Sequence, residues 1–161
     1  FKLHEWKERG AGGSNIMFEL ADNTMAAHVS EFPSGTYKKA HRHGPAASVV
    51  LLNGKGYSLM WLEGESWVKC DWHMGSLFIP PNQWFHQHFN VGKEPGRYLA
   101  VHGSSGGRKH LLGGERRFDT SIKEGGNQKE YEDEDPEVRR LFEQELAKEG
   151  TELKMPPVVR K

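Results

Sequence analysis

The chain has 161 residues with 22 basic and 22 acidic side chains, so its formal net charge at pH 7 is zero. With a pI of ≈ 7.3 it lacks the basic surface that binds nucleic acid or an anionic membrane. One cysteine, Cys70, excludes an internal disulfide framework, and no apolar run approaches the roughly 18 residues of a membrane span. No secretory signal is visible, although a start at Phe1 leaves a trimmed targeting peptide open. We therefore expect one cytoplasmic domain without nucleic-acid or membrane partners.

Hydrophobic residues are unevenly distributed along the chain. Residues 46–101 hold 27 in 56 positions, whereas residues 102–161 hold 14 in 60 together with 25 of the 44 formal charges. This asymmetry predicts three parts. They are a polar arm or edge strand at 1–15, a barrel at 16–102, and glycine-rich loops with a helix at 103–161.

Short apolar runs separated by turn residues predict the strands of the middle part. The expected strands are 16–20, 25–32, 47–52, 56–62, 66–71, 76–79, 84–90 and 97–102. Asn53-Gly54 and Gly64 indicate hairpins between their flanking strands. Strands this short and this regularly spaced predict an all-β sandwich or barrel.

One helix is expected in the last part, at about 136–149. Asp135 suits the N-cap, Pro136 the first helical position and Gly150 the C-terminal stop. Between them Val138, Leu141, Phe142 and Leu146 follow helical periodicity. We expect this amphipathic helix to pack on the barrel or on a partner subunit.

Four of the nine histidines form two His-x-His pairs, His41 with His43 and His86 with His88. On a strand, such a pair places both imidazoles on one face because side chains alternate. A histidine from a neighbouring strand can then complete a facial set of three nitrogens. Neutral imidazoles suit Fe, Zn, Cu or Ni, and surroundings poor in carboxylates disfavour Mg and Ca. The pairs therefore predict a transition-metal site.

The segments that carry these pairs resemble the two sequence motifs of the cupin superfamily. The matching residues are Gly35, His41, His43 and Gly54 in the first motif, and Gly75, Pro81, His86 and Asn90 in the second. The resemblance covers roughly residues 25–102. It implies a double-stranded β-helix (jelly-roll barrel) that holds one metal ion through His41, His43 and His86.

Two positions depart from the motifs. Ser48 stands where the first motif has a glutamate, and Gln83 replaces a glycine of the second, which affects only the turn. Because a neutral hydroxyl is a poor ligand for a divalent metal, we expect three neutral histidines and no carboxylate. Such a site is either decayed or a working three-histidine design, and the three imidazoles in register favour the second interpretation.

Three neutral ligands leave the metal its full double charge, which a bidentate anionic substrate can neutralise while one position stays open for dioxygen. Facial ligation with open positions is typical of non-haem Fe(II) oxygenases. The resemblance to three-histidine cupins implies an Fe(II) dioxygenase that acts on small anionic organic molecules, including aromatic ones. Zn, Mn or Ni would instead support isomerisation or hydrolysis. A third hypothesis is a cupin that binds a small ligand without turnover.

Side-chain alternation identifies further candidates around the metal. If His86 points into the barrel, Trp84 and His88 share its face. His88 could orient a ligand, transfer protons or bind substrate, although a backbone carbonyl can equally satisfy an inward histidine. Arg42 should point to the opposite face, and Arg97 could reach a substrate carboxylate, although a solvated position is more typical. Cupins commonly dimerise through sheets or swapped arms, so the resemblance implies a homodimer.

Overall fold

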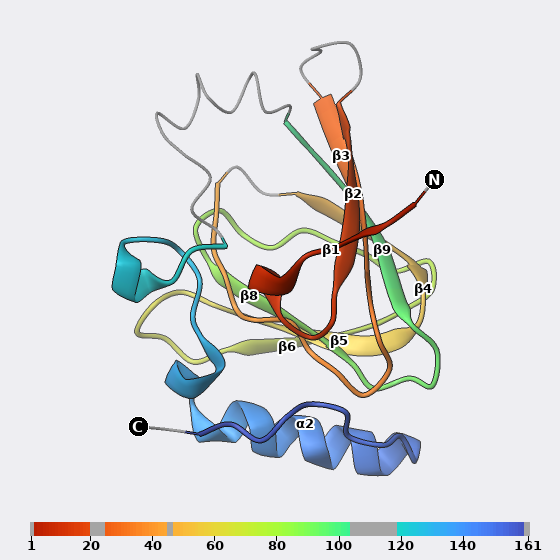
Figure 1. Cartoon of the computed structure of the whole chain (residues 1–161), viewed down its shortest axis with the longest axis vertical. Coiled ribbons are helices and arrows are strands. Elements are labelled where there is room, and N and C mark those ends of the chain that lie inside the picture. Colours follow the sequence, from red (N-terminus) through yellow and green to blue (C-terminus); the bar gives the residue numbers. More distant parts are fainter. Residues whose placement is uncertain (1, 20–24, 45–46, 104–118, 160–161) are drawn as a thin grey trace.

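The computed structural model describes residues 2–19, 25–44, 47–103 and 119–159. They form two antiparallel sheets, and a C-terminal helix packs on the outside of the smaller sheet (Figure 1). The larger sheet has the order β1 (His4–Glu5), β2 (Ser14–Glu19), β3 (Met25–Phe32), β9 (Gly96–Gly103), β4 (Ser48–Asn53) and β7 (Leu77–Phe78). The smaller sheet has the order β6 (Val68–His73), β5 (Lys55–Trp61) and β8 (Phe85–Asn90). The expected all-β fold with one C-terminal helix is confirmed, and each expected strand overlaps an observed one.

The barrel interior lies between the two sheets. Val49 and Leu51 of β4 and Ala100 of β9 pack there with Trp72 from the smaller sheet, and all four are buried. Alternation along β4 therefore directs Val49 and Leu51 inward and Ser48 and Val50 outward.

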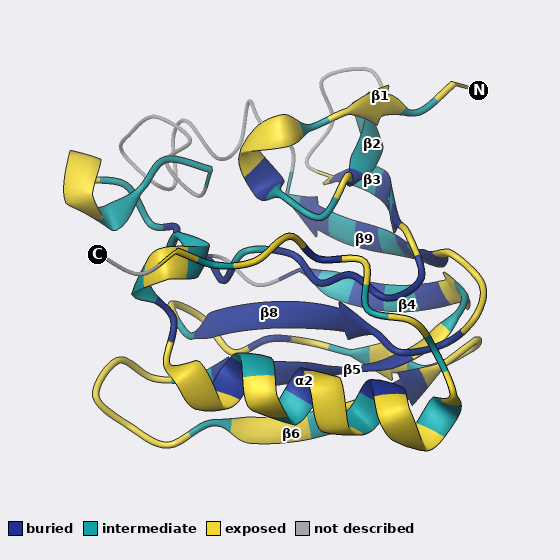
Figure 2. Cartoon of the chain, turned by 60° about the horizontal axis from the view of Figure 1, so that its bottom comes forward, coloured by how far each residue is buried: buried dark blue, intermediate teal, exposed yellow. Residues whose placement is uncertain are grey.

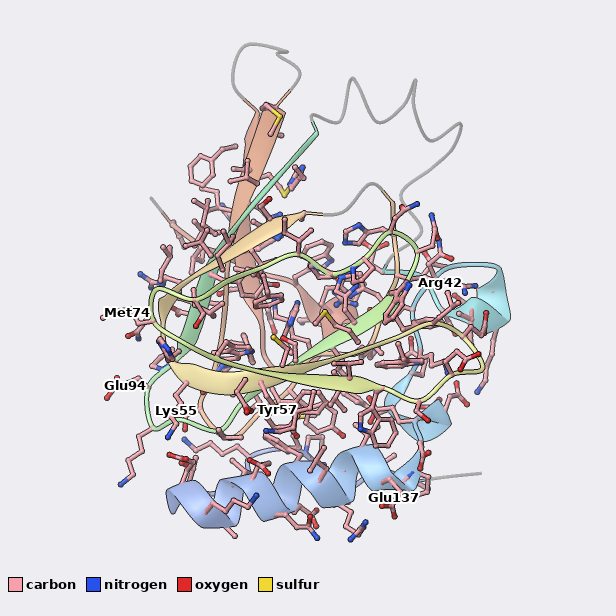
Figure 3. All side chains as sticks on the ribbon, turned by 180° about the vertical axis from the view of Figure 1, so that it is seen from behind. Arg42, Lys55, Tyr57, Met74, Glu94 and Glu137 are labelled. Atoms are coloured by element: carbon pink, nitrogen blue, oxygen red, sulfur yellow. The ribbon has the colours of Figure 1, made fainter. Side chains whose placement is uncertain are left out.

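The helix α2 (Pro136–Glu149) covers the outer face of the smaller sheet. Asp135 caps it by accepting a hydrogen bond from the Glu137 backbone N–H (2.9 Å), and Gly150 ends it with φ of +62°. Phe142 packs on the ring of Tyr37 at a centroid distance of 5.0 Å. The Tyr57 side chain lies between the strands and the helix (Figure 3). Consequently β8 is buried along its whole length, with the barrel on one side and α2 on the other (Figure 2).

The two expected hairpins have different outcomes. Gly64 does join the paired strands β5 and β6. Asn53-Gly54, however, links β4 to β5, which belong to different sheets, so the expectation of a hairpin there is wrong. The glycine is required by a close approach, because a Cβ at Gly54 would lie 2.8 Å from the Cα of Gly96. The turn sequence Asn53-Gly54 therefore marks the place where the chain passes from the larger sheet to the smaller one.

Two short 3-10 helices, η2 (Ile122–Glu124) and η3 (Tyr131–Asp133), precede α2. The segment between them returns to the barrel beside residues 40–42. Lys129 donates its backbone N–H to the Ala40 carbonyl (2.9 Å), and Arg42 donates to the Asn127 carbonyl (3.0 Å). The charged last third is therefore bonded to the segment that carries His41.

Within the described residues, none of the helices has the length and apolar character needed to cross a membrane.

Candidate metal centre

The first His-x-His pair lies on an extended segment that pairs with β8, the last strand of the smaller sheet. His41 donates its backbone N–H to the His86 carbonyl (3.1 Å), and His86 donates in return to the His41 carbonyl (2.8 Å). Lys38, three residues earlier, donates in the same way to the His88 carbonyl (3.1 Å). This pairing brings two histidine motifs side by side although they are more than forty residues apart in sequence.

The three predicted ligands form one cluster. The ring centroids of His41 and His86 are 4.2 Å apart, those of His41 and His43 5.2 Å, and those of His43 and His86 4.9 Å. One nitrogen from each ring lies within 4.8 Å of the others. Three nitrogens at that spacing can hold one metal ion.

Burial keeps two of these rings neutral. It lowers the pKa of both His41 and His86 well below the ordinary histidine value, and the neighbouring cation Arg9 and histidines add to the shift. His86 donates Nδ1–H to the Trp84 carbonyl (3.1 Å), which leaves the Nε2 lone pair directed away from that bond. A neutral imidazole whose second nitrogen is held by a carbonyl is typical of a metal ligand, so His86 fits a transition metal.

His41 has a different partner. The guanidinium of Arg9 donates to His41 Nδ1 and to the side-chain carbonyl of Gln128, and its Nη2 also donates to the Lys39 carbonyl (3.0 Å). Arg9 belongs to the 3-10 helix η1 (Lys7–Arg9) and is only 4% exposed. The N-terminal segment, expected to lie outside the core, thus contributes a buried cation to the centre.

The position of the motif glutamate must be corrected. Ser48 points away from the barrel interior, whereas Ala47 is buried and lines the cavity beside His41 and His43. Ala47 is therefore the residue that takes the place of the fourth ligand. At this place the chain offers the methyl group of Ala47, and none of the residues that line the cavity is acidic.

A cavity of about 50 Å³ opens beside the cluster. Besides His41, His43 and Ala47, it is lined by Trp6, Arg9, Met17, His28, Ser30, Lys38, Tyr98 and His102. None of these lining residues is acidic, and two of them, Arg9 and Lys38, are cations. The cavity therefore attracts anions.

The two predicted pocket residues lie in different surroundings. His88 is buried on the face of His86, at a centroid distance of 5.7 Å, and its Nδ1 contacts the Ser58 hydroxyl (2.8 Å). Burial, with the nearby Lys38 charge, lowers the pKa of His88 to about 3, so it is neutral. Trp84 precedes β8 and is half-buried, and it is not among the residues that line the cavity. Its carbonyl, however, orients His86.

The two arginines that the sequence singled out are engaged elsewhere. Arg42 pairs with Glu63 (2.7 Å) and lies over the ring of Phe85, on the opposite side of the molecule from Met74 (Figure 3). Arg97 bonds to Glu31 (Nε to Oε2, 2.7 Å) across β3 and β9. Neither lines the cavity.

Sequence reasoning missed Arg9, Lys38 and Gln128. Arg9 lies in a polar segment and Gln128 in a glycine-rich loop, where such residues are ordinarily solvated. The one available signal was the extended segment before His41, which indicates that Lys38 lies beside the ligands.

Comparison with known proteins gives a similarity of fold. No protein-family profile matches the sequence, and no curated protein is similar to it in sequence. The Cnp3 cupin domain of Schizosaccharomyces pombe superposes with a TM-score of 0.56 and 20% identity, covering 71% of this chain and 77% of that one. The oxalate decarboxylase of Lactobacillus farciminis, solved as a formate complex, gives 0.55 and 19%, covering 62% and 30%.

The Bacillus subtilis oxalate decarboxylase, described with Mn(II) centres, gives a TM-score of 0.51 and 17% identity, covering 55% of this chain and 25% of that one. This chain therefore spans less than a third of the length of these decarboxylases. Identities this low show a shared fold and leave the reaction to be argued from the site itself.

Proposed function

We propose that this chain, which has the cupin fold, is a metal-dependent enzyme, specifically a mononuclear non-haem Fe(II) dioxygenase of small anionic organic substrates. The observation that supports this proposal is the union of three clustered histidines with a cavity that has cationic and no acidic lining. Such a centre attracts an anion from two directions, the metal and the surrounding cations.

His41, His43 and His86 would hold the metal, which when bound supplies Lewis acidity and the capacity to react with dioxygen. The protein residues bind and orient. The Trp84 carbonyl fixes the ring of His86, and Arg9 restrains that of His41. With no carboxylate ligand at Ala47, the charge of the metal remains to be balanced by the substrate.

We further propose that His88 and Trp84 act on the substrate or its surroundings. His88 is neutral and buried beside His86, so it can accept or donate one hydrogen bond inside the barrel without changing the local charge. Trp84 would shape the approach to His86 from the turn before β8.

Metal analysis of protein purified without an affinity tag tests the ligand set. We expect about one equivalent of transition metal in the wild type, lost in His41→Ala and His86→Ala and kept in His73→Ala, an exposed histidine used as the control. Unchanged occupancy in both ligand variants would contradict the assignment. Oxygen uptake after Fe(II) loading, screened with small aromatic and aliphatic acids, then tests the dioxygenase.

Two other activities would use the same centre. The Mn(II) centres of a structurally similar oxalate decarboxylase favour a manganese enzyme as the second candidate, and Zn or Ni would support isomerisation or hydrolysis. Manganese as the native metal, with turnover that needs no net oxygen uptake, would identify that candidate. Ligand binding without turnover under any metal would identify a binding protein.

We also propose that the protein forms homodimers in the cytoplasm. Leu52, Leu77 and Ile79 are exposed on and beside the neighbouring strands β4 and β7, which provides an apolar surface for a second copy. Cys70 is a free thiol, as is usual in a reducing compartment. Light scattering of the wild type and of Leu77→Glu tests the dimer, which the substitution should dissociate.

A further inference from the structure

Lys38 is a buried cation in the barrel interior. It is 3% exposed and lines the cavity beside the histidine cluster. Its Nζ donates to the hydroxyl groups of Ser30 (2.6 Å) and Tyr98 (3.3 Å) and lies 5.4 Å from the ring centroid of Phe32. An ammonium has three N–H groups, and neither of these two partners is a carboxylate.

Lys39, the next residue, does pair with a carboxylate. The Lys39 side chain reaches the other side of the segment and pairs with Glu130. Among the described residues, no carboxylate forms an ion pair with Lys38 or with Arg9, the second cation of the cavity. A buried charge without a carboxylate partner destabilises the fold. Burial accordingly lowers the pKa of Lys38.

The position of Lys38 in the cavity indicates what can balance its charge. Tyr98, which Lys38 contacts, lies 5.4 Å from His88, and His88 lies 5.7 Å from His86 (ring centroids). Lys38 and Tyr98 also line the same cavity as His41 and His43. A short molecule with two anionic groups can therefore contact Lys38 at one end and a metal held by the histidines at the other.

We propose that Lys38, Ser30 and Tyr98 form a carboxylate-binding subsite, and that the substrate is a small organic acid with a second anionic group for the metal. Lys38 would donate to one carboxylate oxygen, and the hydroxyl of Tyr98 or Ser30 would donate to the other. The inference rests on the proposed function, because it concerns the substrate of the same barrel. The subsite would bind the end of the substrate that does not coordinate the metal.

Calorimetric titration of the full chain with acetate, malonate and succinate tests the subsite, both as purified and after treatment with a chelator. We expect the dicarboxylates to bind the purified protein at least about tenfold more tightly than acetate, because they reach both sites. Lys38→Met should weaken dicarboxylate binding by about tenfold or more, the value of a hydrogen bond to a charged group. Lys39→Met, the matched control, should stay within about twofold.

Tyr98→Phe serves as a second variant, because it removes one hydroxyl and keeps the ring. We expect a loss of about three- to tenfold in dicarboxylate affinity with an unchanged circular dichroism spectrum. Wild-type affinity for dicarboxylates in Lys38→Met, or a purified wild type that prefers none of them over acetate, would overturn the proposal.

The chelator arm separates this inference from the proposed dioxygenase. Binding of a carboxylate that survives chelation and depends on Lys38 supports the subsite even if no oxygen uptake is ever measured. Oxygen uptake that is indifferent to Lys38→Met would support the dioxygenase and refute the subsite.

Discussion

Replacement of Arg9 by methionine should tighten metal binding. A neutral imidazole has one lone pair, and in His41 the Arg9 guanidinium occupies Nδ1. If the metal binds Nε2, that nitrogen must lose its proton to Nδ1, which then faces a donor that cannot accept. If the metal binds Nδ1, it must displace the guanidinium directly. Arg9 therefore competes with the metal at whichever ring nitrogen is used.

The size of the effect follows from that hydrogen bond. A bond to a charged donor contributes about 1.5–3 kcal/mol, and about 1.4 kcal/mol corresponds to a factor of ten. Burial lowers the pKa of Arg9 to about 10, so it keeps its charge at neutral pH and also repels a divalent cation. Both effects act in the same direction, and we expect Arg9→Met to bind metal about 10- to 100-fold more tightly.

Competition with a coloured chelator for Zn(II) or Fe(II) measures this change. Arg42→Met is the matched control, because Arg42 lies between two ligands in sequence but pairs with Glu63 outside the cavity, and its affinity should stay within about twofold. Arg9→Met also leaves Gln128 without one partner, so its thermal unfolding must be recorded alongside. Unchanged or weaker metal binding in a folded Arg9→Met variant would refute the competition.

Three further predictions concern the corrected ligand position, the helix and Lys38. Ala47→Glu should bind metal about tenfold more tightly and turn over anionic substrates more slowly, because it adds a carboxylate beside the ligands. Equal effects from Ser48→Glu would contradict the inward direction of Ala47. Phe142→Ala should lower the free energy of unfolding in urea by about 3–5 kcal/mol, because Phe142 is 0% exposed, and a loss below about 1 kcal/mol would show that α2 packs only loosely. The folded pKa of Lys38 lies below its unfolded value, so the unfolded chain binds more protons in the window between the two. Wild-type stability relative to Lys38→Met should therefore rise with pH up to the unfolded lysine pKa of about 10.4, and a constant difference would refute this sign.

Local signals predicted the secondary structure well. The helix bounds follow from the Asp135 cap, Pro136 and Gly150, each of which acts within one turn of the chain. The strands follow from apolar runs between turn residues. Sheet membership does not, since Asn53-Gly54 has a hairpin sequence and yet joins strands of different sheets.

The candidate centre was predictable only where sequence spacing determines it. In each His-x-His pair the two side chains lie on the same face of an extended segment, and His41, His43 and His86 come together once the two segments pair. The offset between Ala47 and Ser48 was not determined, because a shift of one residue in a loop reverses which side chain faces inward. Arg9 and Lys38 were missed because their burial depends on contacts with distant parts of the chain.

The pairing of His41 with both β8 and Gln128 has a consequence for synthesis of the chain. The last strand of the barrel ends at Gly103, so the two sheets can assemble before the final third has been made. The guanidinium of Arg9 and the backbone of residues 40–42 still lack their partners at Gln128, Asn127 and Lys129 at that stage. A nascent chain can therefore pair His41 with β8 first, and Arg9 and residues 40–42 gain their remaining partners only after residues 127–129 have left the ribosome. The charged final third thus sets the time at which the centre matures.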